Sequence, residues 1–535
     1  MTRTADRPLP GSKPTMRRLL ALPALVALVA SSASGCASAR RPAARGPSAA
    51  ERIAAVDKEL RAGCLECLFQ AYAHFDQLRR EPGIAAEATA GAVRAAALIA
   101  LRQRELGMVD EGYLDIAKGL TAGTPGIPEW LGPVLDIVDT LPRNSAGAAR
   151  SPTTDADLER QRRSRANRNA WLAVLGEYAR FDELAAYTLL SFACDSIDTR
   201  EIPRQELFAD VETFAGAPLI IYRESLCRGI EPSTLEPLRA SDPRFVEIAY
   251  SLGRSNLGAR PRPKLDEAEA LFQQAYAWHP KWPSLTLAVA GLAMTAEDFE
   301  RARAAYEETL ALAPDSVDAQ LGLLRALTYL TRAVEAIAAA DRLIDGRWYV
   351  GEALYWRAYN ELQLSRLDAA WEDVERAEKL VMNAGVPKLA GLIAYRREQL
   401  DTAIARFNTS RERNPLDCET RFYLGVVHAE LHHWPQTTDT LTSAATCFEQ
   451  AEQDLREEIE RIRLSDLRPD RKARRIANRE QQMADGRRRI VTSWFDCAVA
   501  YFSLSQRDEA RQFAEKVAED EQFGARAKDI LSRLR

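Results

Sequence analysis

A short pattern of small and apolar residues recurs along the middle of this chain at an almost constant interval. Each copy has a small residue, an apolar residue four positions later and usually a second small residue seven positions later. The interval between successive copies is 34, 34, 34, 33 and 34 residues, and the copies begin at Ala268, Ala302, Ala336, Ala370, Ala403 and Thr437. A weaker copy begins at Ala510. A fixed period of this length restricts the fold to an array of similar structural units.

The spacing within each copy indicates a helix hairpin. Positions four and seven apart lie on one face of a helix. Pro280, Pro314 and Pro415 follow the three clearest copies by twelve residues and end the helix. A second apolar helix precedes each copy and carries small residues such as Ala390-Gly391. Small residues at facing positions let two helices approach closely, so the unit is a hairpin of 34 residues.

These hairpins resemble the tetratricopeptide repeat over about residues 250 to 450 and again over 491 to 520. The resemblance implies an all-α tetratricopeptide-repeat solenoid of stacked helix hairpins, with a more degenerate helical N-terminal half. Residues 246–447 are predicted to form the regular array. Residues 491–535 are predicted to form a C-terminal repeat and a capping helix.

Residues 51–245 carry only degenerate copies of the pattern. A stretch near residues 121–155 is rich in Pro, Gly, Ser and Thr, which predicts an exposed loop. Two interpretations stay open for this half of the chain. It contains degenerate repeats that continue the array, or it is a separate helical domain packed against the solenoid.

Residues 448–490 interrupt the period with a charged segment. Its first arm is acidic, its second arm is basic, and Pro469 marks a corner between them, which together predict a charged helical hairpin. A solvated extension with weak ion pairs accounts for this pattern. The alternative is a protruding hairpin that docks on a partner or on anionic lipid headgroups.

The N-terminus has the features of an export signal. Arg17 and Arg18 precede an apolar run over residues 19–30, which is too short to span a membrane, and small residues follow it. The segment 33–36 resembles the lipobox of bacterial lipoproteins and ends in Cys36. In that family the Cys becomes the lipidated first residue of the mature chain.

The lipoprotein resemblance implies an anchor and an address. Residues 1–35 are the expected signal peptide, with Met1 or Met16 as its start. Residues 36–50 are the expected lipid anchor and flexible tether, because this stretch has no large apolar residue to bury. Ala37 stands where an Asp often retains such proteins at the inner membrane, so the resemblance implies the outer membrane, facing the periplasm.

Export permits disulfide bonds. Cys418 and Cys447 fall at the start of the first helix and late in the second helix of one predicted hairpin, which places them side by side. We therefore expect a bridge between them, with two small buried thiols as the alternative. Cys64 and Cys67 favour a local bridge or packing on one helix face.

Composition and motifs favour neither an enzyme nor a nucleic-acid-binding protein. The 72 basic and 77 acidic residues give a formal charge of −5, which provides no electrostatic case for nucleic acid. The sequence has no glycine-rich phosphate loop and no G-x-S-x-G elbow. The cluster of His428, His432 and His433 is typical of core or turn histidines. We expect no catalytic residue, no metal and no cofactor.

In tetratricopeptide arrays the first helices line a concave groove, at offsets of 18, 15, 11, 8 and 7 residues before the small residue of each copy. Applied to this sequence, the offsets select Arg325, Tyr329, Tyr355, Tyr359, Lys388, Tyr395, Arg396 and Phe422. Tyr and Arg are enriched among the residues that carry binding energy at interfaces. The selection predicts an aromatic and basic strip that binds a protein or a peptide with an acidic element. For each residue, packing between neighbouring helices is the alternative.

These features predict a lipid-anchored scaffold or adaptor that binds a protein or peptide partner in the bacterial cell envelope, as an accessory to assembly or secretion. The alternative is a lipoprotein that captures a solute or glycan for an outer-membrane transporter. Helical-repeat proteins of that second type scatter their repeats through long irregular insertions. The copies here are contiguous, which favours the scaffold.

Lipidation of Cys36 is testable by metabolic labelling in the native host. Labelled fatty acid should enter the wild-type protein but not the Cys36→Ser variant, because the thiol is the acceptor of the lipid. The variant should then fractionate as a soluble periplasmic protein. Equal labelling of both proteins would contradict the lipoprotein assignment.

Overall fold

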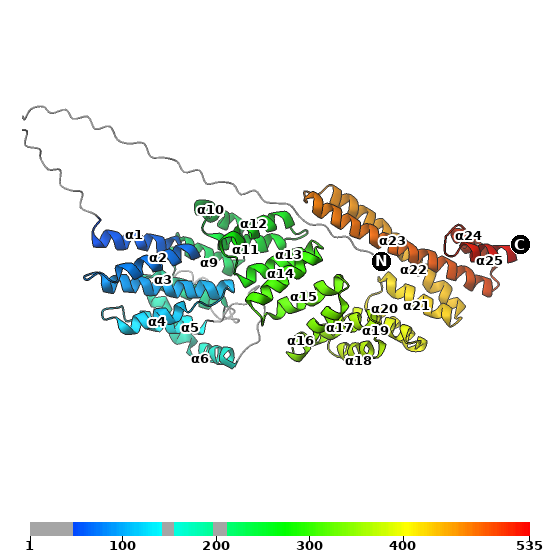
Figure 1. The fold of residues 1–535 in the computed structure, drawn as a ribbon, viewed down its shortest axis with the longest axis horizontal. Helices are drawn as coiled ribbons and strands as arrows, with labels where there is room; N and C mark the ends of the chain where they lie inside the picture. The colour runs from blue at the N-terminus through cyan, green and yellow to red at the C-terminus, as the bar shows by residue number, and fades with distance from the viewer. Residues whose placement is uncertain (1–46, 142–154, 196–210, 230, 535) are drawn as a thin grey trace, which may run out of the picture. The chain divides into compact units, whose positions relative to one another are not determined.

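The computed structural model describes residues 47–141, 155–195, 211–229 and 231–534, which fold into helices joined by turns (Figure 1). No strand occurs in these described residues, and the predicted all-α fold is confirmed. Residues 49–535 form one compact unit. The predicted signal peptide, Cys36 and most of the predicted tether lie outside the described residues.

The N-terminal half consists of short and medium-length helices. They are α1 (Ala49–Ala62), α2 (Leu65–Leu78), α3 (Ala85–Leu106), α4 (Tyr113–Gly123), α5 (Leu131–Thr140), α6 (Asp155–Tyr178), α7 (Glu183–Asp195), α9 (Pro218–Arg228) and α10 (Pro232–Ser241), with a 3-10 turn at Glu212–Phe214.

The array and the C-terminal region follow without interruption. Their helices are α11 (Val246–Leu257), α12 (Leu265–Trp278), α13 (Pro283–Thr295), α14 (Phe299–Leu312), α15 (Val317–Tyr329), α16 (Ala333–Asp345), α17 (Val350–Gln363), α18 (Leu367–Glu378), α19 (Gly385–Arg396), α20 (Leu400–Arg413), α21 (Cys418–Glu430), α22 (Trp434–Arg463), α23 (Pro469–Ser503), α24 (Arg507–Val517) and α25 (Gly524–Arg533).

From α11 to α24 each odd-numbered helix packs on the even-numbered helix that follows it, in the predicted register. The small residue that begins each copy is completely buried in every case: Ala268, Ala302, Ala336, Ala370, Ala403, Thr437 and Ala510. The turn inside successive hairpins has one residue with a left-handed backbone at φ between 57° and 60°: Glu297, Thr331, Ser365, Glu398 and His432. The turns therefore recur at the same interval as the buried small residues.

Glycines on the first helices allow the closest helix contacts. A Cβ atom at Gly391 would lie 2.6 Å from a ring carbon of Phe407, and a Cβ atom at Gly322 would meet the ring of Tyr306 even more closely. Both rings stand four positions after the small residue of their copies, and both are buried. The period in the sequence therefore reflects the contact between a small residue on one helix and a large residue on the facing helix.

The N-terminal half packs directly on the array. One cluster of buried apolar residues extends from Ile53 of α1 to Leu292 of α13. The indole Nε1 of Trp282 donates a 2.6 Å hydrogen bond to the carbonyl oxygen of Leu106 at the end of α3. Arg102 of α3 and Glu247 of α11 are fully buried and form an ion pair at 2.9 Å.

The helix α5 lies within the stretch 121–155, in which the sequence predicts a loop. Leu131, Val134 and Val138 are buried on one face of this helix. Pro133 falls in the first turn of α5, where a helix tolerates Pro because the missing N–H group would have no helical partner. Residues 142–154 lie outside the described residues.

The predicted charged hairpin at 448–490 is built from the extended ends of two array helices. α22 continues without a break past residue 447, and α23 begins at Pro469 and continues past residue 490. The two helices pack along each other (Figure 1). Pro469 stands at the corner that the sequence indicated, in the first turn of α23.

Three disulfides occur in the described residues. One joins Cys418 at the start of α21 to Cys447 of α22, with Cα atoms 5.5 Å apart, which is the pairing that the sequence favours. The others join Cys64 to Cys67 and Cys194 to Cys227. The Cys418–Cys447 bridge closes the open end of one hairpin.

The close glycine contact predicts a selective loss of stability. Gly391→Ala should lower the free energy of unfolding by about 1–3 kcal/mol, because the added methyl group overpacks against Phe407. Thermal unfolding followed by circular dichroism measures the change. Gly291→Ala in α13 is the matched control, since no atom lies within 4 Å of its added Cβ and Ala favours a helix. An equal effect of the two substitutions would contradict the packing argument.

Candidate partner-binding groove

The structure places all eight predicted groove residues on the first helices of consecutive hairpins. Arg325 and Tyr329 belong to α15, and Tyr355 and Tyr359 belong to α17. The others are Lys388, Tyr395 and Arg396 on α19, and Phe422 on α21. Consecutive first helices lie side by side. These residues therefore share one side of the array, with the exception of Phe422.

Aromatic rings gather where α15 and α17 meet. Trp356 is the centre of the cluster, with ring centroids 5.2 Å from Tyr355, 6.1 Å from Tyr329 and 6.2 Å from Tyr359. Tyr329 also stacks on Phe299 at 4.6 Å. We call these five residues the aromatic cluster. Its outermost member is Tyr329, which keeps 52% of its surface exposed.

The two tyrosines of α17 are more buried than Tyr329. Burial raises the pKa of both Tyr355 and Tyr359. A neutral hydroxyl group on an apolar ring both donates and accepts hydrogen bonds. The cluster thus presents apolar surface together with uncharged polar atoms.

Arg325 is paired within the groove. Its Nε atom donates a 3.0 Å hydrogen bond to Oε1 of Glu352 in the first turn of α17. The indole nitrogen of Trp356 donates to the same oxygen atom at 3.3 Å. The positive charge of Arg325 is therefore compensated, and the carboxylate also orients the central ring of the aromatic cluster.

Lys388 is paired as well. Its Nζ atom lies 3.1 Å from carboxylate oxygens of both Asp417 and Glu419 at the start of α21. Burial opposes the charge, yet the two carboxylates hold the pKa of Lys388 above its ordinary value. Glu419 also binds Arg489 of α23 at 2.7 Å. Around Lys388, the predicted basic strip is therefore a chain of alternating charges.

Tyr395 and Arg396 differ in their surroundings. The hydroxyl group of Tyr395 donates a 2.5 Å hydrogen bond to Oε1 of Glu430 on α21, which together with burial raises the pKa of this tyrosine. Arg396 is exposed, and its side chain forms no hydrogen bond or ion pair within the described part of the chain. Of the three predicted cations, Arg396 is the one available to a partner.

Phe422 is a packing residue, which corrects its assignment to the groove surface. Only 8% of Phe422 is exposed, and its ring packs edge-on against Phe448 at 6.3 Å. α22 continues past residue 447 and thereby brings Phe448 over this position. The extension that interrupts the repeat also covers one end of the predicted strip.

A cavity of about 410 Å³ borders the aromatic cluster, within the size range of ligand-binding pockets. Its lining residues are Glu352, Tyr355, Trp356, Val381, Asn383 and Gly385. Its aromatic rings, one carboxylate and one amide can contact both the backbone and the side chains of a peptide.

The acidic partners in the groove were missed although the sequence contains their signal. Glu352 and Glu419 stand 18 residues before Ala370 and Thr437, and Glu430 stands seven before Thr437. These are the same offsets that select the predicted groove residues. Trp356 stands at none of these offsets, so its position at the centre of the aromatic cluster required the structure.

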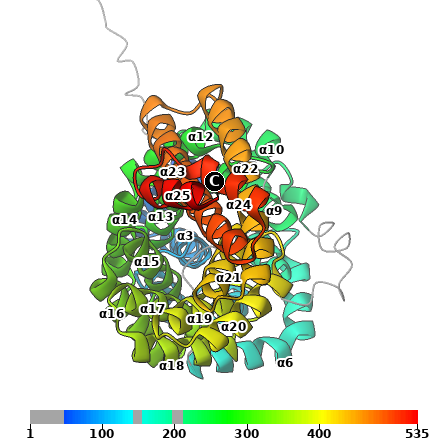
Figure 2. The same cartoon turned by 90° about the vertical axis from the view of Figure 1, so that its right-hand side faces the viewer.

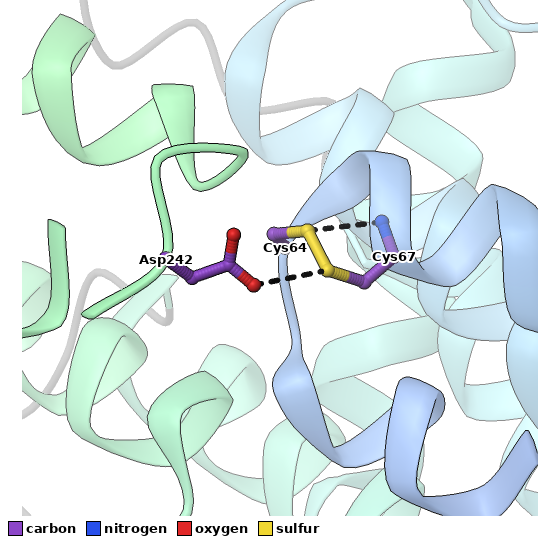
Figure 3. Close-up of side chains that lie close together, drawn as sticks. All are labelled: Cys64, Cys67 and Asp242. Atoms are coloured by element: carbon purple, nitrogen blue, oxygen red, sulfur yellow. Dashed lines mark hydrogen bonds between the residues drawn. A yellow bond between two sulfur atoms is a disulfide. The ribbon is translucent and has the colours of Figure 1, made fainter. Parts of the chain in front are cut away.

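Other clusters of potential ligands offer little chemistry. Figure 3 shows Cys64, Cys67 and Asp242, where Sγ of Cys67 lies 3.8 Å from Oδ2 of Asp242. The two sulfur atoms are bonded to each other and completely buried, so neither is a thiolate that could bind a metal. Nδ1 of His428 lies 3.4 Å from Nδ1 of His433, and burial lowers the pKa of His428.

The carboxyl group of Asp496 predicts a pH dependence of stability. Burial and the Glu430 carboxylate raise the pKa of Asp496 on α23 to about 6, although Arg526 acts in the opposite direction. An unfolded Asp titrates near 3.9, so the folded protein binds this proton more tightly. The contribution to stability is full below about pH 4 and is lost as the pH rises through about 6.

Asp496→Asn should therefore raise the midpoint of thermal unfolding at about pH 8, and the gain should vanish near pH 4. Circular dichroism at the two pH values measures both midpoints. A gain of the same size at both pH values would show that the charge of Asp496 is not the cause.

Comparisons with known proteins bear on the fold. Residues 290–350 match the tetratricopeptide repeat family. Similar solved structures include the APC/C hetero-tetramer Cut9–Hcn1, at 13% identity and a TM-score of 0.39 over 91% of this chain and 93% of that chain. Another is PilW, a type IV pilus biogenesis factor, at 16% identity and a TM-score of 0.34 over 37% and 91%. A third is a tetratricopeptide repeat protein from Parabacteroides merdae, at 13% and 0.33 over 54% and 98%.

No curated protein matches the chain, and the comparisons indicate no enzyme family. Within the described residues, none of the helices combines the length and the apolar character that crossing a membrane requires. The family match over residues 290–350 and the fold of stacked helix hairpins together support a tetratricopeptide-repeat protein.

Proposed function

We propose that this chain is a lipid-anchored scaffold that binds a protein or peptide partner in the bacterial cell envelope through the groove of its array. The observation that carries the proposal is the aromatic cluster where α15 and α17 meet, with Tyr329 half-exposed and with Tyr355 and Trp356 lining a cavity. Rigid aromatic side chains bind partners at a low cost in conformational entropy, and they dominate the energetics of protein interfaces.

The groove recognises its partner by contact and hydrogen bonding rather than by net positive charge. Arg325 and Lys388 are neutralised by Glu352, Asp417 and Glu419. A partner must therefore supply apolar side chains for the aromatic cluster and polar groups for the paired charges around it. Arg396 adds one exposed positive charge at the α19 end of the groove.

The anchoring part of the proposal rests on the sequence. An apolar run precedes a segment that resembles a lipobox, and residues 37–48, before α1, contain no large apolar residue. A lipid on Cys36 would tether the helical unit at the outer membrane, facing the periplasm. A scaffold that is held at a membrane meets its partner at a raised local concentration.

Site-specific photo-crosslinking in the native host tests the groove assignment. A photoreactive amino acid at position 329 should crosslink to a defined partner, because this side chain is half-exposed at the edge of the aromatic cluster. The matched control is position 334 on the second helix α16, where Val334 is 64% exposed.

The expected result is a discrete crosslinked species from position 329 and none from position 334. Truncation of a neighbouring anchor, Tyr359→Ala, should reduce the yield from position 329, since an interface anchor contributes about 2 kcal/mol or more. Crosslinks of equal yield from both positions, or from position 334 alone, would refute the groove assignment.

A further inference from the structure

The outer end of the α22–α23 hairpin contacts the first hairpins of the array in the same chain. Figure 2 shows this end beside α12. Arg471 of α23 is 2% exposed, and its guanidinium group binds Asp266 and Glu269 of α12, with 2.7 Å between Nη2 and Oε2 of Glu269. The two sides of this contact are more than 200 residues apart in the sequence.

Further contacts surround Arg471. The backbone N–H group of Arg468 donates a 2.8 Å hydrogen bond to Oδ2 of Asp266. The guanidinium group of Arg468 lies 2.8 Å from the carboxylate of Glu269. Two carboxylates one helical turn apart are thus held by Arg468 and Arg471 of the hairpin.

A second set of contacts involves the turn between α13 and α14. Arg474 lies 3.0 Å from Asp298, and Arg479 donates to Glu297 at 2.6 Å. The amide group of Asn478 donates to the second oxygen of Glu297, also at 2.6 Å. Arg479 bridges in addition to Glu458 of α22, at 2.9 Å.

The junction is held mainly by ion pairs, although Ile459 and Ile462 at the hairpin end and Leu265 of α12 are also almost completely buried. None of the clusters of buried apolar residues in the described chain joins the hairpin end to α12. A cavity of about 740 Å³ lies between residues 261–267 and the hairpin end at residues 461–467. Ion pairs that lie next to an open cavity can exchange one carboxylate for another.

We infer that the α22–α23 hairpin is a latch, which closes on carboxylates of its own chain and opens to bind an acidic segment of the partner. The latch consists of Arg468, Arg471, Arg474, Arg475 and Arg479 on the hairpin and of Asp266, Glu269, Glu297 and Asp298 on the array. This inference deepens the proposed function and rests on it, because it names the chemistry of the partner.

The partner chemistry follows from what the latch holds when it is closed. Its ligands are four carboxylates, two of them one turn apart on a helix, so a protein segment rich in Asp and Glu presents the same groups. Arginine binds carboxylates through paired hydrogen bonds, which favours such a segment over a diffuse negative surface. The acidic recognition that the sequence suggested for the groove is thereby assigned to the hairpin.

The first experiment tests closure alone, by hydrogen exchange of the full chain. The variant Arg471→Glu/Arg474→Glu places negative charges opposite the carboxylates of the array. The arginines are changed and Glu269 is kept, because Glu269 also binds Arg301 of α14. The matched control is Arg463→Glu/Arg488→Glu, which makes the same change in charge at exposed residues whose partners lie in their own helices.

In the latch variant, amides of residues 264–270 and 464–475 should exchange about tenfold faster or more, because unpaired buried charges favour opening. The control should match the wild type. Raising NaCl from about 0.1 to about 1 M, which shortens the Debye length from about 10 to about 3 Å, should speed exchange at the same segments in the wild type. Unchanged exchange in the latch variant would overturn the latch.

The second experiment tests the partner chemistry with a fluorescent poly-glutamate peptide and fluorescence anisotropy. The peptide should bind the wild type and the control alike, and its affinity for the latch variant should fall by about tenfold or more. Bound peptide should also speed exchange at residues 264–270, because it displaces α12 from the arginines.

Equal affinity for all three proteins would overturn the acidic-segment assignment. Binding to phosphatidylglycerol vesicles with none to the peptide would overturn it as well, by assigning the hairpin to lipid. The crosslink at position 329 reports on the groove independently, so a failure of the latch and a failure of the proposed function are distinguishable.

Discussion

The close approach of a small residue and a large one between facing helices is the contact on which the rest of the array depends. Gly391 beneath Phe407 and Gly322 beneath Tyr306 are examples, and the small residues of every copy are completely buried. Since each hairpin mainly contacts its neighbours, the repeated contact sets the spacing of the first helices. That spacing in turn places side chains at equivalent offsets next to one another and so creates the groove.

The ion pairs of the groove run between consecutive first helices. Arg325 of α15 binds Glu352 of α17, and Lys388 of α19 binds Glu419 of α21. Partly exposed pairs of this kind contribute little to stability. Their effect is to cancel charge along the face, so the proposed binding there depends mainly on the aromatic cluster. If the basic side chains of the groove had no acidic partners in the array, they would attract any anionic molecule.

The sequence predicted what repeats and failed where the chain departs from the repeat. The buried positions and the helix pairs follow from the period, because local spacing determines which side of a helix is buried. Phe422 is covered because α22 extends beyond the length of its repeat. The latch lay beyond sequence reasoning, since charged residues about 200 positions apart share no periodic signal. Only the fold brings Arg471 to Asp266.

A contact between distant hairpins has a different consequence from contacts between neighbours. An array held only by neighbouring contacts bends by small rotations at each interface. The latch fixes α12 relative to α23, so every interface between them is constrained while it is closed, including those of α15, α17 and α19 that carry the aromatic cluster. A ligand that opens the latch therefore changes the free energy that is needed to alter the curvature of the groove. By linkage, a ligand that prefers one curvature of the groove shifts the latch to the same extent.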